Sequence, residues 1–316
     1  MPALSVIIVS YNVRELLRGC LDSVYAELPR VTGQHQVFVV DNASGDGSSD
    51  MVRSLFPEAL LVQNSGNLGF AAANNQALLR CRGEYVVLLN PDTLLKEGSL
   101  ATLVTFLETH PMAGMVGPQL IYGDGSFQHS GFAFPTLAQV VLDLFPAHHR
   151  VMDSRFNGRY ERSRYRALEP FEIGHPLGAC MVVNSRAVAA VGPMDEGFFM
   201  YCEEVDWAMR FHRGGWGVFC VPGAVVVHYG GQSTGQFRDD MFVALWRSRF
   251  RLFHKHYGAG FRRCVRFVVA LGLRRLRSEA KRHFAARHYT QDELSSRLRA
   301  YDKVAALCRT RDWSAV

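Results

Sequence analysis

Apolar runs of six or seven residues occur four times before residue 120, and stretches with helical spacing separate them. Within each run the apolar residues are nearly continuous rather than alternating, which is typical of strands covered on both faces. The runs occupy residues 4–10, 36–41, 59–64 and 84–90, and the helical stretches occupy residues 13–27, 48–56 and 70–81. This succession of strand and helix predicts an α/β fold with a Rossmann-like, doubly wound, mostly parallel sheet.

The regular alternation stops at about residue 120. Residues 120–172 are rich in Gly, Pro, His and aromatic side chains without a clear period, which predicts a long loop that is functional or mobile. Regular patterns return after it, at residues 178–192, 194–216, 224–231 and 239–256. We therefore expect the first domain to extend to about residue 258.

The composition is that of a large globular chain. Of 316 residues, 48% are hydrophobic and 20% are charged, and no uncharged apolar stretch reaches the roughly 18 residues that a membrane span needs. The apolar N-terminus lacks a basic leader and a cleavage site, so we interpret it as the first strand of a cytoplasmic protein. The seven cysteines are scattered without a C-x-x-C pair, which favours a reduced compartment and argues against structural zinc.

Positive charge is concentrated in one segment near the C-terminus. Residues 261–288 contain nine Lys or Arg and one acid, Glu279, for a local net charge of +8, so the rest of this +6 chain carries about −2. Apolar residues fall at helical intervals among these cations, namely Val265, Val268, Val269, Leu273 and Leu276. The pattern predicts a basic amphipathic helix that either packs on the preceding domain or rests on an anionic membrane surface.

Polar residues cluster where the predicted strands end, which is where parallel sheets bind ligands. The residues at these ends include Ser10, Tyr11, Asn12, Asp41, Asn67, Asn90 and Asp92, together with Gly69. The nearest match to the dinucleotide fingerprint G-x-G-x-x-G begins at Gly45 and has Asp50 in place of the third glycine, and no P-loop motif occurs. An oxidoreductase or methyltransferase on this sheet is therefore disfavoured.

Two of these carboxylates suit different parts of a nucleotide ligand. A carboxylate at a strand tip is often solvated or caps a helix, so either one alone carries little information. Asp41 could accept hydrogen bonds from a base or ribose, whereas Asp92 is a hard oxygen ligand for Mg²⁺ or Mn²⁺ bridging phosphates. His228, at the end of another apolar run, could be a second metal ligand or an ordinary packed histidine.

A second group of acids lies in the segment FFMYCEEVDWAMR. Glu203, Glu204 and Asp206 stand at the start of a predicted helix, where negative charge is favourable by only about 0.3–1 kcal/mol each. Aromatic surroundings raise the pKa of a carboxyl group and equip it as a general base. We therefore expect one of these acids to act chemically and the others to position it.

The order of these motifs resembles that of the family 2 inverting glycosyltransferases, and of their rhamnosyltransferase-like members in particular. The matching segments are SVIIVSYN, VVDNASGDGS, NLGFAAANN, LLNPDT, FFMYCEEVDWAMR and VVVHYGG. They extend over about residues 4–256, and the ordered set is far more specific than any one motif. The resemblance implies a GT-A fold, a nucleotide-sugar donor and a divalent metal, Mg²⁺ or Mn²⁺.

The resemblance also implies roles for individual residues. Donor-binding residues would be Ser10, Tyr11, Asn12, Asp41, Asn67, Gly69, Asn74 and Asn90. The segment from Asn90 to Asp92 corresponds to the D-x-D motif of the family with Asn in place of the first Asp, so Asp92 would hold the metal together with His228. Glu204 would be the base that activates the acceptor, with Glu203 as the alternative and Asp206 in support.

The function implied is inverting transfer of a sugar, with dTDP-rhamnose as the favoured donor, to a saccharide or lipid-linked saccharide in cell-surface polysaccharide synthesis. A UDP- or GDP-hexose donor remains an alternative, as does a non-catalytic carbohydrate- or nucleotide-binding module with this fold. Nothing in the sequence indicates a nucleic-acid partner.

The resemblance also divides the chain. It implies a catalytic domain at residues 1–258, with a nucleotide-binding half at 1–120 and an acceptor-binding half at 121–258, followed by a basic helical tail at 259–316. We expect a cytoplasmic enzyme whose residues 261–288 could contact the inner face of the cell membrane. Such contact would suit an acceptor that is linked to a polyprenyl diphosphate in that membrane.

Overall fold

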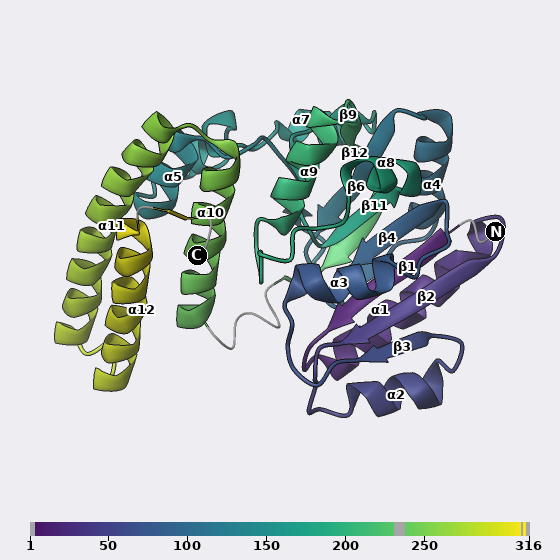
Figure 1. The fold of residues 1–316 in the computed structure, drawn as a ribbon, viewed down its shortest axis with the longest axis horizontal. Helices are drawn as coiled ribbons and strands as arrows, with labels where there is room; N and C mark the ends of the chain where they lie inside the picture. Colours follow the sequence, from purple (N-terminus) through teal and green to yellow (C-terminus); the bar gives the residue numbers. More distant parts are fainter. Residues whose placement is uncertain (1–3, 231–237, 311, 314–316) are drawn as a thin grey trace. The chain divides into compact units, whose positions relative to one another are not determined.

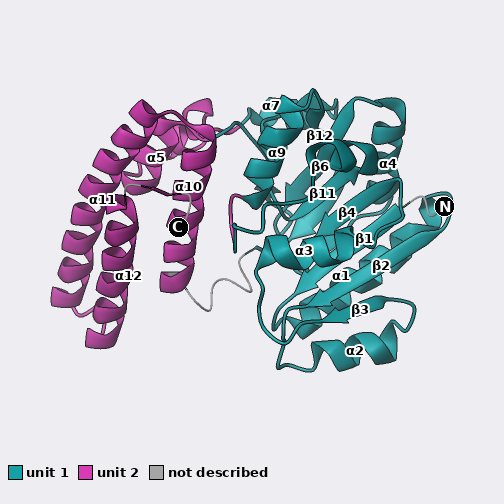
Figure 2. Cartoon of the chain, viewed as in Figure 1, with its two compact units in different colours: residues 1–134, 160–199, 203–233 teal, residues 135–159, 200–202, 234–316 magenta. Residues whose placement is uncertain are grey.

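The computed structural model describes residues 4–230, 238–310 and 312–313. The chain forms two compact units, shown in different colours in Figure 2. Unit 1 comprises residues 1–134, 160–199 and 203–233, and unit 2 comprises residues 135–159, 200–202 and 234–316. The units are discontinuous in sequence, and the predicted domain limit at residue 258 stays a prediction.

Unit 1 is built on one large sheet with the strand order β3-β2-β1-β4-β11-β6-β12-β5 (Figure 1). Its main strands are β1 (Leu4–Ser10), β2 (His35–Asp41), β3 (Leu60–Gln63), β4 (Tyr85–Leu89), β5 (Thr93–Leu95), β6 (Ala113–Ile121), β11 (Cys180–Asn184) and β12 (Gly217–His228). β1 to β4 run parallel, as predicted, whereas β11 runs antiparallel to both β4 and β6.

Four short strands complete unit 1. Two of them extend the main sheet, because β7 pairs with β6 and β9 pairs with β12, while β8 and β10 pair with each other. Their bounds are β7 (Phe127–Gln128), β8 (Gly131–Phe132), β9 (Phe171–Glu172) and β10 (His175–Pro176). They give structure to parts of the irregular stretch at 120–172, which is therefore not one continuous loop.

The central strands are buried on both faces, which explains their continuous apolar sequences. All seven residues of β1 and all five of β4 are buried. Successive side chains point to opposite faces, so Val6 and Ile8 belong to one hydrophobic cluster and Ile7 and Val9 to the other. A sheet covered in this way leaves its strand ends as the place for a polar ligand.

The helices of unit 1 include the three predicted before residue 90, which are confirmed to within three residues. The set is α1 (Arg14–Glu27), η1 (Leu28–Arg30), α2 (Ser48–Leu55), α3 (Phe70–Leu78), α4 (Ser99–Thr109), α7 (Arg162–Arg166), α8 (Ser185–Val191) and α9 (Glu203–Arg213). The strand predicted at 224–231 corresponds to the second part of β12, which ends at His228, and residue 231 lies outside the described residues. Pro222 and a register shift between Val221 and Val225 interrupt β12. Because of this interruption, the sequence pattern did not predict its first part.

Unit 2 is helical. Its elements are α5 (Leu137–Leu144), α6 (His149–Met152), η2 (Arg155–Asn157), α10 (Arg238–His256), α11 (Ala259–Ala285) and α12 (Gln291–Arg309). The predicted C-terminal helical extension is therefore confirmed. α12 begins with a capping box, in which Thr290 and Glu293 satisfy each other's backbone N–H groups.

Unit 2 has a core of its own. Trp246, Phe250 and Trp313 are at most 1% exposed, and the rings of Phe250 and Trp313 stack with their centroids 4.5 Å apart.

Within the described part of the chain, none of the helices combines the length and apolar character needed to cross a bilayer.

Candidate active site

Asp41 lies at the carboxyl end of β2, where the parallel ladder pairs it with Ser10 of β1. Asp41 is 2% exposed and accepts hydrogen bonds from the Ser44 N–H at 3.1 Å and the Ser49 hydroxyl at 2.5 Å. These bonds fix the turn that follows β2, which is an ordinary structural role for such a carboxylate. Because a carboxylate has about four acceptor sites, Asp41 can hold the turn and a ligand hydroxyl together.

The turn after β1 is tied to the same segment. Asn12 has a positive φ of 53°, donates its N–H to Ser44 Oγ at 3.0 Å and accepts the Gly45 N–H at 2.8 Å through its side chain. Ser10 is fully buried, and its hydroxyl has no partner within the described part of the chain. Tyr11 is half-buried. The structure thus brings the predicted residues of the first two strand ends to one edge of the sheet.

α3 begins at a close contact between two backbone segments. Gly69 has a φ of 84°, and a Cβ atom there would lie 2.3 Å from the carbonyl oxygen of Phe199, so only glycine fits. Asn67 accepts the Gly69 N–H at 2.9 Å, and the Phe70 N–H donates to the Phe199 carbonyl at 2.8 Å. Asn74 is buried and donates its amide to the Phe70 carbonyl at 2.9 Å.

Asn75, the neighbour of Asn74, was not among the predicted site residues. It is 2% exposed, and its side chain donates to the Met194 carbonyl at 2.9 Å and to Glu196 at 3.0 Å. Its amide oxygen accepts the Met194 N–H at 3.1 Å. Asn75 therefore joins α3 to the segment 194–199 that precedes the acid pair. The signal in the sequence was a pair of Asn residues inside an otherwise apolar helix.

Asp92 and His228 are brought together by the pairing of β5 with β12. The antiparallel ladder pairs His228 with Thr93, and the Tyr229 N–H donates to the Asp92 carbonyl at 3.0 Å. His228 Nε2 lies 3.6 Å from Asp92 Oδ1, and the two side chains are only 10% and 8% exposed. On its other side, His228 Nδ1 lies 3.2 Å from Gln128 Oε1. Gln128, in β7, is a partner that the sequence did not indicate.

The chemistry of this pair fits a divalent cation. Burial lowers the pKa of His228 against the opposing effect of the Asp92 carboxylate, so burial favours a neutral imidazole. With Nδ1–H donating to Gln128, the lone pair is on Nε2, the atom nearest Asp92. No group of three or more His, Cys, Asp or Glu suited to a metal occurs among the described residues. Two protein ligands suffice where substrate phosphates supply the others.

The acid pair opens α9. The two residues before it, Tyr201 and Cys202, both have positive φ values, 69° and 66°. Glu203 is 5% exposed, and burial together with the charge of Glu204 raises its pKa well above the ordinary value. Burial raises the pKa of Glu204 to about 7, while hydrogen bonds from its own N–H and that of Val205 oppose this. Glu204 is the more exposed of the two acids, so an acceptor can reach it more readily.

Glu204 lies close to the end of β4. A Cβ atom on Gly178 would be 3.7–3.9 Å from the Cβ, Cγ and Cδ atoms of Glu204. The next residue, Ala179, accepts the Asn90 N–H at 2.9 Å. These contacts place Glu204 at the same edge of the sheet as Asn90 and Asp92.

Asp206, the third predicted acid, is fully buried in α9. It accepts a hydrogen bond from Arg210 Nε at 2.9 Å, in an ion pair one helical turn apart. Arg210 also donates to three carbonyl groups in the turn after α8, those of Val191, Gly192 and Pro193. Asp206 thereby fixes the arginine that holds this turn.

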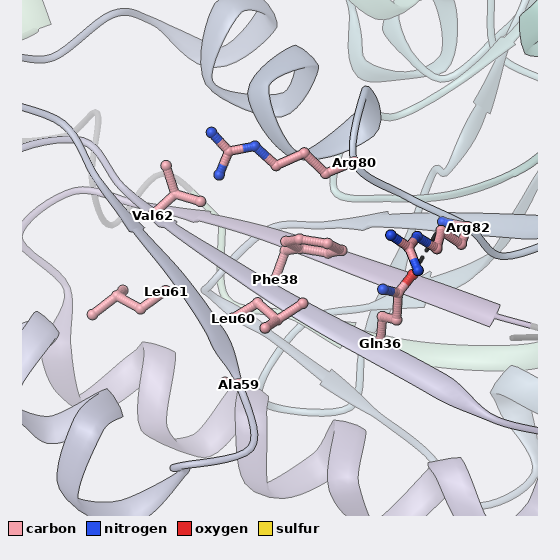
Figure 3. A pocket seen from close by; sticks show the side chains of 8 residues that line it. All are labelled: Gln36, Phe38, Ala59, Leu60, Leu61, Val62, Arg80 and Arg82. Carbon is pink, nitrogen blue, oxygen red and sulfur yellow. Dashed lines mark hydrogen bonds between the residues drawn. The ribbon is translucent and has the colours of Figure 1, made fainter.

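A pocket of about 550 Å³ lies elsewhere on unit 1, beside the edge strand β3 (Figure 3). Apolar side chains of β2 and β3 line it together with Arg80 and Arg82, and the Arg82 N–H donates to Gln36 Oε1 at 3.0 Å. None of the predicted site residues lines this pocket, whose residues are Gln36, Phe38, Ala59, Leu60, Leu61, Val62, Arg80 and Arg82.

Comparison with known proteins finds relatives over most of the chain. The model of the family "Glycosyl transferase family 2" matches residues 5–191. An N-acetylglucosaminyl-diphospho-decaprenol L-rhamnosyltransferase of Mycobacterium tuberculosis is 28% identical over 84% of this chain and 89% of its own length. Rhamnosyltransferase WbbL of Escherichia coli is 22% identical over 78% of this chain and 90% of its own length.

Solved structures share the fold at low sequence identity. Mannosyltransferase PcManGT from Pyrobaculum calidifontis, in complex with GDP-Man and Mn²⁺, is 19% identical with a TM-score of 0.60, covering 97% of this chain and 86% of that chain. GalNAc-T7 with UDP, GalNAc and Mn²⁺ is 14% identical with a TM-score of 0.56, covering 80% of this chain and 48% of that chain. At these identities the likeness shows the fold alone.

Proposed function

Since the chain belongs to glycosyl transferase family 2 and is a glycosyltransferase with the GT-A fold, as its motifs predicted, we propose that it transfers rhamnose from dTDP-rhamnose with inversion at the anomeric carbon. The acceptor in this proposal is a saccharide, carried on a polyprenyl diphosphate, in cell-surface polysaccharide synthesis. The two relatives named as rhamnosyltransferases support the donor, and the name of the first supports the lipid-linked acceptor.

The observation that carries the proposal is the convergence of two chemically different groups at one sheet edge. A buried carboxylate–imidazole pair, Asp92 and His228, has its partner atoms 3.6 Å apart. Glu204, whose pKa is raised to about 7 by burial, lies near the end of β4, the strand that precedes Asp92 in the sequence, through the contacts of Gly178 and Ala179. The first group suits the diphosphate of a donor, and the second suits the hydroxyl group of an acceptor.

The remaining strand ends would bind the nucleotide. Asp41 and Ser10, whose buried hydroxyl has no partner among the described residues, offer hydrogen-bonding groups at the ends of adjacent strands. The other members of the proposed donor site are Tyr11, Asn12, Asn67, Gly69, Asn74 and Asn90. We assign Asp206 a supporting role through Arg210.

The transfer step follows from these positions. Glu204, deprotonated, accepts the proton of the acceptor hydroxyl, and the oxygen lone pair forms a bond to the anomeric carbon. The bond from that carbon to the diphosphate oxygen breaks on the opposite face, so the configuration inverts and the nucleoside diphosphate keeps the bonding electrons. A divalent cation held by Asp92 and His228 would neutralise the charge on this leaving group. Burial and the charge of Glu204 raise the pKa of Glu203, which disfavours a second charge beside the base.

Nucleotide binding with and without Mn²⁺ tests the donor and metal assignments. We expect calorimetry to show that dTDP-rhamnose binds more tightly with Mn²⁺ than without it, and more tightly than UDP- or GDP-hexoses. Asp92→Asn removes a charged oxygen ligand, so it should weaken Mn²⁺-dependent binding by at least about 10-fold. The matched control is Asp22→Asn, which changes an exposed carboxylate on α1 and should leave binding unchanged.

Several outcomes would contradict the proposal. Equal donor affinity in Asp92→Asn and the parent protein would remove Asp92 from the metal site. Tighter binding of a UDP- or GDP-hexose would replace the proposed donor. Donor binding without any transfer to a range of lipid-linked saccharides, by the intact protein, would favour a non-catalytic binding module.

A further inference from the structure

α11 has one face that packs inside unit 2. The buried residues of this helix recur at spacings of three and four, which places them on one side of the helix. They are Val265, Val269, Gly272, Leu273 and Ala280. The contact is close, since a Cβ atom on Gly272 would lie 2.8 Å from Leu144 of α5. The opposite side of α11 is therefore the one that solvent reaches.

That opposite side, the outer face of α11, combines cations with large apolar side chains. Phe267 is 67% exposed and Leu271 is 37% exposed. Large apolar side chains that lie together at the surface often mark an interaction site. Exposed cations continue the same spacing along the helix, at Arg263, Arg274, Lys281 and Arg282. The only acid of α11 is Glu279, and its charge is paired with Arg275 at 3.4 Å.

The other arginines of α11 contact neighbouring residues of unit 2. Arg262 contacts His254, Arg266 donates to the Thr310 carbonyl, Arg275 donates to the Leu144 carbonyl and Arg277 pairs with Asp302. By contrast, the side chains of the four outer-face cations form no hydrogen bond or ion pair with any residue that the structure describes. The fold thus explains one half of the positive charge of α11 and leaves the other half for a partner outside the chain.

We propose that the outer face of α11 binds an anionic lipid surface. Four unpaired cations complement anionic headgroups, while Phe267 and Leu271 can insert at the boundary between headgroups and acyl chains. A second copy of this chain fits less well, because two such faces would repel each other. The inference concerns where the enzyme works, and it stands without the proposed chemistry because vesicle binding requires no sugar transfer.

Sedimentation of the full chain with vesicles tests this inference. We expect binding to vesicles of phosphatidylcholine with phosphatidylglycerol, weakened at high salt, and little binding to phosphatidylcholine alone. Each cation removed should weaken binding about fivefold, so Arg274→Gln/Lys281→Gln should lose about 25-fold. Phe267→Ser should also weaken binding, and its loss should persist at high salt because it is not electrostatic.

The matched control is Arg80→Gln/Arg82→Gln, which removes two exposed cations beside the pocket of unit 1 (Figure 3). This control should lose far less binding than the double variant of α11. Equal losses in both variants would overturn the inference, because net charge rather than this face would then explain binding. Self-association of the parent protein that disappears in Arg274→Gln/Lys281→Gln would also overturn it and would assign the face to a second copy. Failure of the parent protein to bind anionic vesicles would also overturn the inference, and it would leave the proposed donor and transfer reaction unaffected.

Discussion

At the scale of single residues, strand ends carry most of the information in this sequence. Asp41 and Asp92 each follow a buried apolar run, and this position alone predicts that they lie at the ligand-binding edge. Gln128 and Asn75 could not be found in this way. Their partners, His228 and Met194, lie 100 and 119 residues away along the chain, so these hydrogen bonds depend on the folded arrangement of strands.

Replacement of Glu204 tests the assignment of the base. Because burial raises the pKa of Glu204 to about 7 and only the deprotonated form accepts a proton, kcat/KM should rise tenfold per pH unit below 7 and level off above it. Glu204→Gln should lower kcat about 10²- to 10⁴-fold while donor affinity, measured by calorimetry, stays unchanged. Initial rates between pH 5.5 and 8.5 give this profile.

Glu203→Gln is the informative control for that experiment. It removes the neighbouring carboxyl but keeps the proposed base, so it should retain most of the activity and its pH dependence. The reverse result, loss of activity in Glu203→Gln with activity kept in Glu204→Gln, would make Glu203 the base. A flat profile in the parent protein would argue against either acid as a base that titrates near neutral pH.

At the scale of elements, α3 and the segment 194–199 form a joined pair. The Phe70 N–H binds the Phe199 carbonyl, and Asn75 binds both backbone groups of Met194. The proposed donor residues at the start of α3 are thereby held against the chain that leads into the acid pair of α9. Sequence patterns predicted α3 and α9 as separate helices but not this connection. It depends on the close contact of Gly69 with the backbone of Phe199, two residues that are far apart in the sequence.

Gly69→Ala tests the connection between these elements. The substitution places a side chain at a positive φ and against the Phe199 carbonyl, so we expect a loss of stability of about 1–3 kcal/mol and weaker donor binding. Thermal unfolding and calorimetry measure the two effects. Gly45→Ala is the control, since a Cβ atom at Gly45 would meet nothing within 4 Å. A Gly69→Ala protein as stable as Gly45→Ala would show that the two segments do not meet closely.

At the scale of the whole molecule, the first half of the sheet was more predictable than the second. β1 to β4 are joined by helices in regular βαβ units, so the local succession of strand and helix patterns is enough to predict their arrangement. β5 follows β4 closely in sequence, yet it pairs with β12, and β11 lies between β4 and β6. Unit 2 likewise combines residues 135–159 with 234–316. Such long-range pairings leave no periodic signal, and only the family resemblance indicated the complete fold.

The acid pair of α9 should make the stability of the whole protein depend on pH. The folded state raises the pKa of both Glu203 and Glu204, so it binds their protons more tightly than the unfolded chain does. This stabilisation is complete below the ordinary carboxyl pKa of 4.5 and is lost as pH rises through about 7 for Glu204. Allowing for its partial exposure, Glu204 alone should lower the free energy of unfolding by on the order of 1–2 kcal/mol between pH 5 and pH 8, and Glu203 adds a change of the same sign.

The double variant Glu203→Gln/Glu204→Gln should lose most of that pH dependence. Its amides stay neutral at every pH, so the buried site never has to accommodate a charge, and at pH 8 the variant should melt a few degrees above the parent protein. Scanning fluorimetry at pH 5 and pH 8 measures both differences, with Glu15→Gln as an exposed control on α1. A variant less stable than the parent at pH 8 would mean that contacts stabilise the charged Glu204 more than burial destabilises it. Higher stability together with lost activity would show that this fold gives up stability to keep a base at its active edge.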